Sequence, residues 1–261
     1  MSTPALAVQF SDAEMRLLQS LVYHECGMFF DARRTHFLQD RLQRRLRECR
    51  LDSFYSYYRL LISTEGKQEL ARLLEDLTVN ETSFFRNKAQ LELFHKHILD
   101  ELIRKKDASG DRNLRIWSAG CSTGQEPYTI AMLVADALGY HQLRMPNPAA
   151  TTWPKPLVPP PWTVEIPASD ISYSVLRAGQ EGLYSEHQMA SVDYNYRLRY
   201  FDKVGERYAV KRPVKELVHF DFHNLKLVRQ FAEFLEATCR SVTFQGVHRA
   251  TDTAHHLAVL R

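Results

Sequence analysis

The stretch RIWSAGCSTGQEPYTIAML, residues 115 to 133, decides the fold class. A short apolar run, Leu114 to Trp117, is followed by small residues and then by a helical pattern with Glu126 near its start. This order is typical of the first strand, turn and helix of a parallel α/β sheet, in which ligands lie beyond the carboxyl ends of the strands. Gly120 and Gly124 fit the turn, because residues without a side chain allow a tight turn and a close ligand. The dinucleotide fingerprint G-x-G-x-x-G is absent, so the turn alone is weak evidence for a ligand site.

The sequence after this stretch predicts the rest of a parallel sheet. The helix is predicted over Gln125 to Gly139. Residues 141–163 contain seven of the eleven prolines and are predicted to form an insertion with little regular structure. Further strands are predicted at Trp162 to Ile166, Arg207 to Lys211 and Leu217 to Phe222. Residues 235–244 are a candidate for one more strand.

Two acidic residues are candidates for contacts with the ribose of a nucleoside ligand. Asp170 is expected a few residues past the end of the second strand, where an acidic residue usually holds ribose hydroxyls. Alternatively, Asp170 caps the helix that follows. Glu126 has a similar alternative, because the helix dipole stabilises a carboxylate in the first helical turn without any ligand.

The sequence before this stretch predicts a small all-helical domain at residues 1–79, followed by the α/β domain at residues 80–261. Ser11 and Asp12 can cap the first helix. Apolar residues then recur at helical spacing in four stripes, the last of which ends at Leu77. A further helix around Leu91 to Ile103 precedes the first strand.

Composition excludes several classes of protein. No apolar run is long enough for a membrane-spanning helix, and the first residues do not resemble a secretory signal, so we expect a cytoplasmic protein. The formal charge of +3 is too small to indicate a nucleic-acid partner. The cysteines have no CxxC spacing, which argues against a metal site and against disulfides; we expect reduced thiols at Cys26, Cys49, Cys121 and Cys239.

Six motifs, in this order, resemble those of the CheR-type chemoreceptor glutamate methyltransferases. They are LTVNETSFFRN (77–87), RIWSAGCSTGQEPYTIAM (115–132), ASDIS (168–172), GLYSEHQM (182–189), RYF (199–201) and FDFHNLK (220–226). The resemblance covers roughly residues 10–226. It implies a Rossmann-like methyltransferase domain with a small inserted β-subdomain at about 200–219, behind a helical receptor-docking domain. It also implies an enzyme that uses S-adenosylmethionine, releases S-adenosylhomocysteine and forms methyl esters on glutamates of bacterial chemoreceptors.

The resemblance also implies which residues bind the cofactor. Asn80, Thr82 and Arg86 would lie beside its amino-acid end. Glu126 and Asp170 would face its ribose, with Gly120 in the turn. The adenine side would be lined by Asn224 and Leu225, and the matching positions further on are Ser241 and Val242. A guanidinium can pair with the cofactor carboxylate, so Arg86 is the expected positioning residue.

The reaction implied by the resemblance needs little proton chemistry. A glutamate side chain is already an anionic nucleophile at neutral pH, since its reference pKa is about 4.3. Catalysis can come from alignment and desolvation. We therefore predict no general base and assign no catalytic residue.

An arginine-rich segment indicates how a partner is held. Arg33, Arg44 and Arg47 are predicted on one side of a helix, where acidic cytoplasmic helices of methyl-accepting chemoreceptors would be attracted. The alternative is an ordinary solvated helix face. The hairpin RYFDKVGERYAV (199–210) lacks the additional glycine-containing residues of family members that bind a receptor tail peptide, so we expect no such tether. We expect a monomer.

The chain departs from the family after residue 226. In FLEATCRSVTF (234–244), Ser241 replaces the asparagine of the family's Cys-Arg-Asn-Val, and only seventeen residues follow Phe244. A sheet without its last strands would have an open edge. A truncated chain, a frame-altered or degenerate gene, and a natural variant completed by a partner remain open explanations. The alternatives to an active enzyme are accordingly a non-catalytic regulator that binds the cofactor poorly and, less favoured, a nucleic-acid-binding module.

Overall fold

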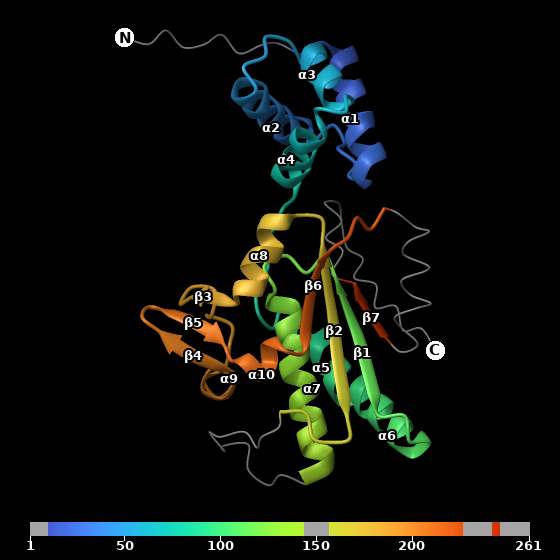
Figure 1. Cartoon of the computed structure of the whole chain (residues 1–261), viewed down its shortest axis with the longest axis vertical. Coiled ribbons are helices and arrows are strands. Elements are labelled where there is room, and N and C mark those ends of the chain that lie inside the picture. The colour runs from blue at the N-terminus through green and yellow to red at the C-terminus, as the bar shows by residue number, and fades with distance from the viewer. Residues whose placement is uncertain (1–9, 144–156, 227–241, 246–261) are drawn as a thin grey trace. The chain divides into compact units, whose positions relative to one another are not determined.

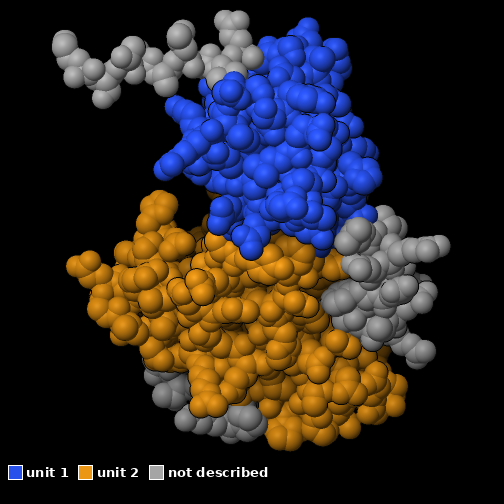
Figure 2. All heavy atoms as spheres, turned by 45° about the horizontal axis from the view of Figure 1, so that its top comes forward, with its two compact units in different colours: residues 1–79, 224–227 blue, residues 80–223, 228–261 orange. Residues whose placement is uncertain are grey.

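The protein divides into two compact units. The computed structural model describes residues 10–143, 157–226 and 242–245. Of these residues, one unit comprises 10–79 and 224–226 (Figure 2). The other unit comprises 80–143, 157–223 and 242–245. Among the described residues, none of the helices combines the length and apolar character that a membrane crossing requires.

The first unit is a set of four helices, among the residues described. They are α1 (Asp12–Cys26), α2 (Thr35–Glu48), α3 (Phe54–Leu61) and α4 (Lys67–Leu77). Ser11 caps α1 as predicted, because its hydroxyl accepts from the Glu14 N–H while the Glu14 carboxylate accepts from the Ser11 N–H. Most residues of the predicted apolar stripes lie in the core, where Leu18, Leu42 and Leu73 are fully buried. Tyr23 and Ile62, which the same spacing placed in the stripes, are instead exposed.

The second unit is built on a parallel sheet of four strands, as far as the structure describes it. They are β1 (Asn113–Ala119), β2 (Thr163–Asp170), β6 (Val218–Phe222) and β7 (Val242–Gln245). Their spatial order is β6-β2-β1-β7, so the chain builds outward on one side of β1 and then returns to the other (Figure 1). The carboxyl end of β1 therefore lies where the strand order reverses, the usual ligand position in such sheets. The predicted α/β class is confirmed.

Two strands are longer than the sequence predicts. β1 continues through Ala119, and β2 continues through Asp170, which is the last residue of its strand. The expectation that Asp170 lies past the strand end is therefore wrong. The sequence predicts an earlier end for β2 because Pro167 interrupts the apolar pattern and cannot donate a hydrogen bond to a neighbouring strand. Pairing with β6 nevertheless runs from Ile166 to Asp170.

Helices flank this sheet. α7 (Gln125–Leu143) follows β1, and α8 (Tyr173–Glu181) follows β2. The single helix predicted before β1 is a continuous run of α5 (Lys88–Leu93), the π-helical η1 (Phe94–Leu99) and α6 (Asp100–Ser109). α7 extends to Leu143, so the first residues of the predicted insertion are helical; no proline occurs there before Pro146. Residues 144–156 of the predicted insertion lie outside the described residues, and residues 157–162 form bends and a turn before β2.

A smaller antiparallel sheet projects from the same unit. Its strands are β3 (Leu183–Ser185), β4 (Phe201–Val204) and β5 (Arg207–Val210), in the order β3-β5-β4. The sequence predicted the β4–β5 hairpin, whereas β3 lies upstream of residue 200 and was missed because three residues give no strand pattern. α9 (Tyr194–Tyr200) ties this sheet to α7, since the Asp136 carboxylate accepts from Tyr200 Oη at 2.6 Å and from Arg199 Nη1 at 2.8 Å. α10 (Arg212–Lys215) leads into β6.

Candidate functional site

The turn after β1 is held in a conformation that small residues favour. Gly120 and Gly124 have φ of 73° and 91°, and Ser122 between them has φ of 49°. A non-glycine residue in this region is uncommon and occurs where the surroundings impose it. Two hydrogen bonds fix the start of the turn, because the N–H groups of Gly120 and Cys121 both donate to the Ser169 carbonyl, at 2.8 and 2.9 Å.

Asp170 fixes the middle of the turn. Its carboxylate accepts from the Ser122 N–H at 2.9 Å and from the Ser172 N–H at 3.0 Å. The side chain is buried, and burial raises its pKa while these backbone hydrogen bonds oppose the shift. The alternative role as a helix cap is wrong, because the hydroxyl of Ser172 caps α8. Each carboxylate oxygen keeps a second lone pair that a ligand hydroxyl can use.

Glu126 lies in the first turn of α7 beside the same loop. Its Oε1 accepts from Ser118 Oγ at 2.7 Å. Burial raises the pKa of Glu126 to about 7, and the hydrogen bond from Ser118 and the charge of Arg86 partly oppose that shift. Ser118 was not singled out from the sequence, since a serine within a strand gives no local signal of its partner.

The segment that contains Arg86 is fastened to α7 and to the turn. The Asn80 carbonyl accepts from Ser122 Oγ at 3.0 Å, and the Phe85 N–H donates to Thr129 Oγ1 at 3.2 Å. Arg86 is exposed, and its Nη1 donates to the Glu81 carbonyl at 3.0 Å.

Both neighbours of Arg86 are strained. Phe85 has φ of 50° and Asn87 has φ of 56°. Such φ values cost on the order of 1–3 kcal/mol each and cluster at functional sites. Thr82, half-buried, belongs to the same segment. The structure thus gathers five predicted residues around one turn: Asn80, Arg86, Gly120, Glu126 and Asp170.

The remaining predicted cofactor residues belong to other segments of the chain. Asn224 and Leu225 belong to the first unit, where Asn224 Nδ2 donates to the Glu25 carbonyl at 2.7 Å. Val242 is the first residue of β7 and pairs with Ile116 of β1. Ser241 lies outside the described residues, and their assigned roles stay predictions.

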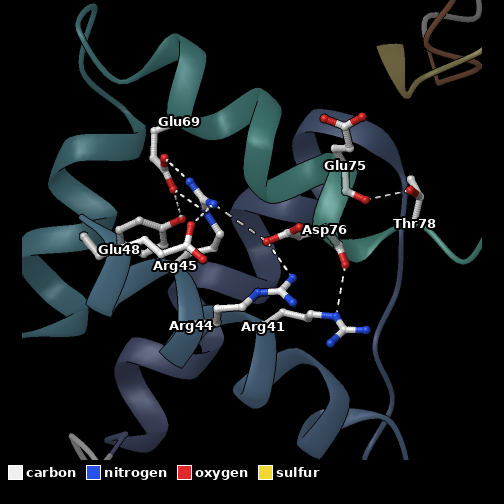
Figure 3. Close-up of polar contacts among 9 residues, drawn as sticks. Arg41, Arg44, Arg45, Glu48, Glu69, Glu75, Asp76 and Thr78 are labelled. Atoms are coloured by element: carbon white, nitrogen blue, oxygen red, sulfur yellow. Dashed lines mark hydrogen bonds and ion pairs between the residues drawn. The ribbon is translucent and has the colours of Figure 1, made fainter. Parts of the chain in front are cut away.

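The arginines predicted to face a partner differ in their surroundings. Arg33 lies before α2, not on it, because the Asp31 carboxylate accepts from the N–H groups of Arg33 and Arg34 and forms a turn there. Arg44 pairs with Asp76 at 2.8 Å (Figure 3). Arg47 remains exposed, and its Nε donates to the Gln43 carbonyl.

Figure 3 also shows an ion pair that the sequence did not suggest. Arg45, on the same helix, is buried and makes two hydrogen bonds to Glu69, with Nε–Oε1 at 2.8 Å and Nη2–Oε2 at 2.5 Å. Tyr57 Oη donates to the same carboxylate at 2.8 Å. Burial raises the pKa of Glu69, but the hydrogen bonds from Arg45 and Tyr57 outweigh it, so the pKa is lowered.

Comparison with known proteins gives consistent matches along both units. Residues 80–146 and 155–244 match the family described as CheR methyltransferase, SAM binding domain, and residues 13–78 match the CheR methyltransferase all-alpha domain.

Individual relatives match over most of the chain. A chemotaxis protein methyltransferase of Escherichia coli is 33% identical over 220 residues, 84% of this chain and 67% of the relative. One from Borreliella burgdorferi is 28% identical over 84% of this chain and 72% of its own length. A probable chemotaxis protein methyltransferase of Rhizobium etli is 30% identical over 85% and 77%.

Proposed function

Because the chain belongs to the CheR methyltransferase family and contains its SAM-binding domain, we propose that it methylates glutamate side chains of bacterial chemoreceptors, forming methyl esters in the cytoplasm. One observation supports this most directly. Two carboxyl groups, those of Glu126 and Asp170, lie at the turn after β1, and the charge of Arg86 is near enough to act on Glu126. Relatives named chemotaxis protein methyltransferases point to chemoreceptors as the substrate.

The chemistry of these side chains fits S-adenosylmethionine. The amino-acid end of the cofactor has a carboxylate, which the exposed Arg86 guanidinium can bind by charge-assisted hydrogen bonds. The ribose hydroxyls and the ammonium group need acceptors, and the oxygens of Asp170 and Glu126 can supply them. Asp170 is oriented in advance by the Ser122 and Ser172 N–H groups, which lowers the entropy cost of binding.

When bound, S-adenosylmethionine supplies an electrophilic methyl group on a sulfonium. The attacking group is the receptor glutamate, which is anionic at neutral pH because its reference pKa is about 4.3. No residue of this chain has to remove a proton. Its part is to hold the cofactor at the turn, to align the two reactants and to exclude water, which together lower the barrier without acid–base chemistry.

The receptor helices would be attracted to the first unit. Arg33 and Arg47 are exposed, and Arg44 is half-exposed although paired with Asp76. A basic surface of this kind mainly raises the association rate of acidic partners. Because salt screens the attraction, docking should weaken as salt concentration rises.

Transfer of labelled methyl groups to chemoreceptor-containing membranes tests this function. We expect label that mild base releases, as it does from an ester.

Arg86→Ala should weaken S-adenosylhomocysteine binding about tenfold to a hundredfold, because a hydrogen bond to a charged group contributes about 1.5–3 kcal/mol. Arg104→Ala is the matched control, since Arg104 is also exposed and pairs with Asp100 of the same helix, α6. Cofactor binding without any base-labile label on the receptor would refute the proposed reaction.

A further inference from the structure

Two aromatic rings stack on each other at the carboxyl edge of the parallel sheet. Tyr173 is the first residue of α8, and Phe222 is the last residue of β6. Their ring centroids lie 4.5 Å apart with planes inclined by 8°. Both side chains remain accessible to solvent, Tyr173 at 63% and Phe222 at 39%. Each ring covers one face of the other, so an incoming flat ring can stack only on an outer face of the pair, at the edge where ligands of parallel sheets bind.

This pair lies directly beside Asp170. Phe222 is the register partner of Asp170 between β6 and β2, and the His223 N–H donates to the Asp170 carbonyl at 3.0 Å. Tyr173 follows Asp170 closely in the chain, after the Ser172 cap. α8 packs against both β2 and β6, so the aromatic pair is fixed by regular elements rather than by a loop.

The order of chemical groups along the sheet edge matches that of a nucleoside amino acid. At the end of β1 lie Glu126 and the nearby Arg86, which suit the charged amino-acid end. Asp170 at the end of β2 suits the ribose. If Asp170 holds the ribose and the amino-acid end points to β1, the base must extend the other way, toward β6. Neighbouring strands are about 4.8 Å apart, so these positions span the size of one nucleoside.

We propose that Tyr173 and Phe222 form the platform on which the adenine ring of S-adenosylmethionine stacks. This inference rests on the cofactor and site orientation of the proposed function, and it assigns adenine recognition to two residues that the resemblance did not indicate. Mutual shielding explains why the rings touch each other, but it does not explain why both remain exposed beside Asp170. Stacking on an aromatic face tolerates any orientation of the base edge, so it adds affinity while other groups supply specificity.

Calorimetry with S-adenosylhomocysteine tests the platform. Tyr173→Ala should weaken binding about tenfold, and Phe222→Leu, which keeps apolar bulk but removes the flat ring, should have a similar effect. Tyr173→Phe should bind like the wild type. Tyr194→Ala is the matched control, because Tyr194 is likewise the first residue of a capped helix and is 70% exposed, but on α9. It should leave the affinity unchanged.

Adenine absorbance separates stacking from a structural role. Stacking lowers the ultraviolet absorbance of the base, so wild type and Tyr173→Phe should show the decrease on binding and Tyr173→Ala should lose it. Wild-type affinity in both Tyr173→Ala and Phe222→Leu would overturn the platform and leave the methyltransferase intact. Absence of S-adenosylhomocysteine binding by the wild type would overturn both. Binding with a working platform but no receptor methylation would contradict only the proposed function.

Discussion

At the scale of single residues, Glu126 should make the stability of the second unit depend on pH. Burial raises its folded pKa to about 7, above its ordinary value of 4.5. Between pH 4.5 and 7 the folded state therefore binds this proton more tightly than the unfolded state does. The free energy of unfolding should fall as pH rises through this range, by roughly 1.4 kcal/mol per pH unit at most.

Glu126→Gln isolates this effect, because glutamine keeps the shape and cannot ionise. We expect the variant to unfold at a higher urea concentration than the wild type at pH 8, with the difference vanishing near pH 4. Asp111→Asn is a control, because the hydrogen bond from Lys106 lowers the pKa of the exposed Asp111. Asp111 should therefore stabilise the fold more as pH rises, which is the opposite of the effect expected from Glu126. An unchanged pH profile in Glu126→Gln would contradict the assigned environment.

The positions of the candidate site residues were easier to predict than their contacts. Motifs pointed to Asp170 and Glu126 without the structure, because each motif keeps its residue types together. The hydrogen bond from the Ser122 N–H to Asp170 joins residues 48 apart in sequence, and it depends on the positive φ of Ser122. No local pattern encodes such a backbone conformation at a serine.

At the scale of elements, Gly124 should be intolerant of any side chain. It has φ of +91°, and an added Cβ would lie 2.9 Å from Phe220 Cζ and 3.1 Å from Tyr184 Oη. Gly124→Ala thus combines backbone strain of about 1–2 kcal/mol with overpacking of about 1–3 kcal/mol. Gly110→Ala is the matched control, because Gly110 has φ of +77° and nothing within 4 Å of its Cβ position. Urea unfolding should show only the smaller strain for Gly110→Ala; equal losses would contradict the packing argument.

The C-terminal end of α1 should depend on residues far along the chain. Lys226 Nζ donates to the His24 carbonyl and lies 5.4 Å from the Tyr23 ring centroid. A cation at the C-terminal end of a helix can donate to one of the last carbonyls and interacts favourably with the helix dipole. Lys226→Ala should therefore lower the free energy of unfolding by about 1 kcal/mol. Hydrogen exchange in the last turn of α1 should accelerate. Lys67→Ala, at the first residue of α4 where the dipole disfavours a cation, should not destabilise its helix.

Elements were predictable where their pattern is local and long. The four helices of the first unit and the start of β1 follow from apolar periodicity, which a single segment contains. The end of β2 and the short strand β3 do not follow from such a pattern. Pairing with β6 extends β2 to Asp170, and pairing with β5 defines β3. Strand ends of this kind depend on a partner that is distant in sequence.

At the scale of the whole molecule, each unit has its own buried residues, both apolar and polar. In the first unit, the buried Arg45–Glu69 ion pair should have a large effect on stability. Removing one partner of a buried pair leaves an uncompensated charge and typically costs 3–5 kcal/mol. Arg45→Met should therefore lower the melting temperature of the first unit by more than about 10 °C. S-adenosylhomocysteine should still stabilise the second unit, whose candidate site residues Arg86, Glu126 and Asp170 are unchanged.

Two further variants separate the buried charge from general disruption of the helix. Arg44→Met removes a half-exposed pair with Asp76 from the same helix, and it should cost at most about 1 kcal/mol. Arg45→Met combined with Glu69→Leu should recover part of the lost stability, because no charge then remains buried without a partner. Scanning calorimetry of the full chain with and without S-adenosylhomocysteine measures both transitions. If Arg45→Met and Arg44→Met shift the first transition equally, burial of the pair is not what stabilises this unit.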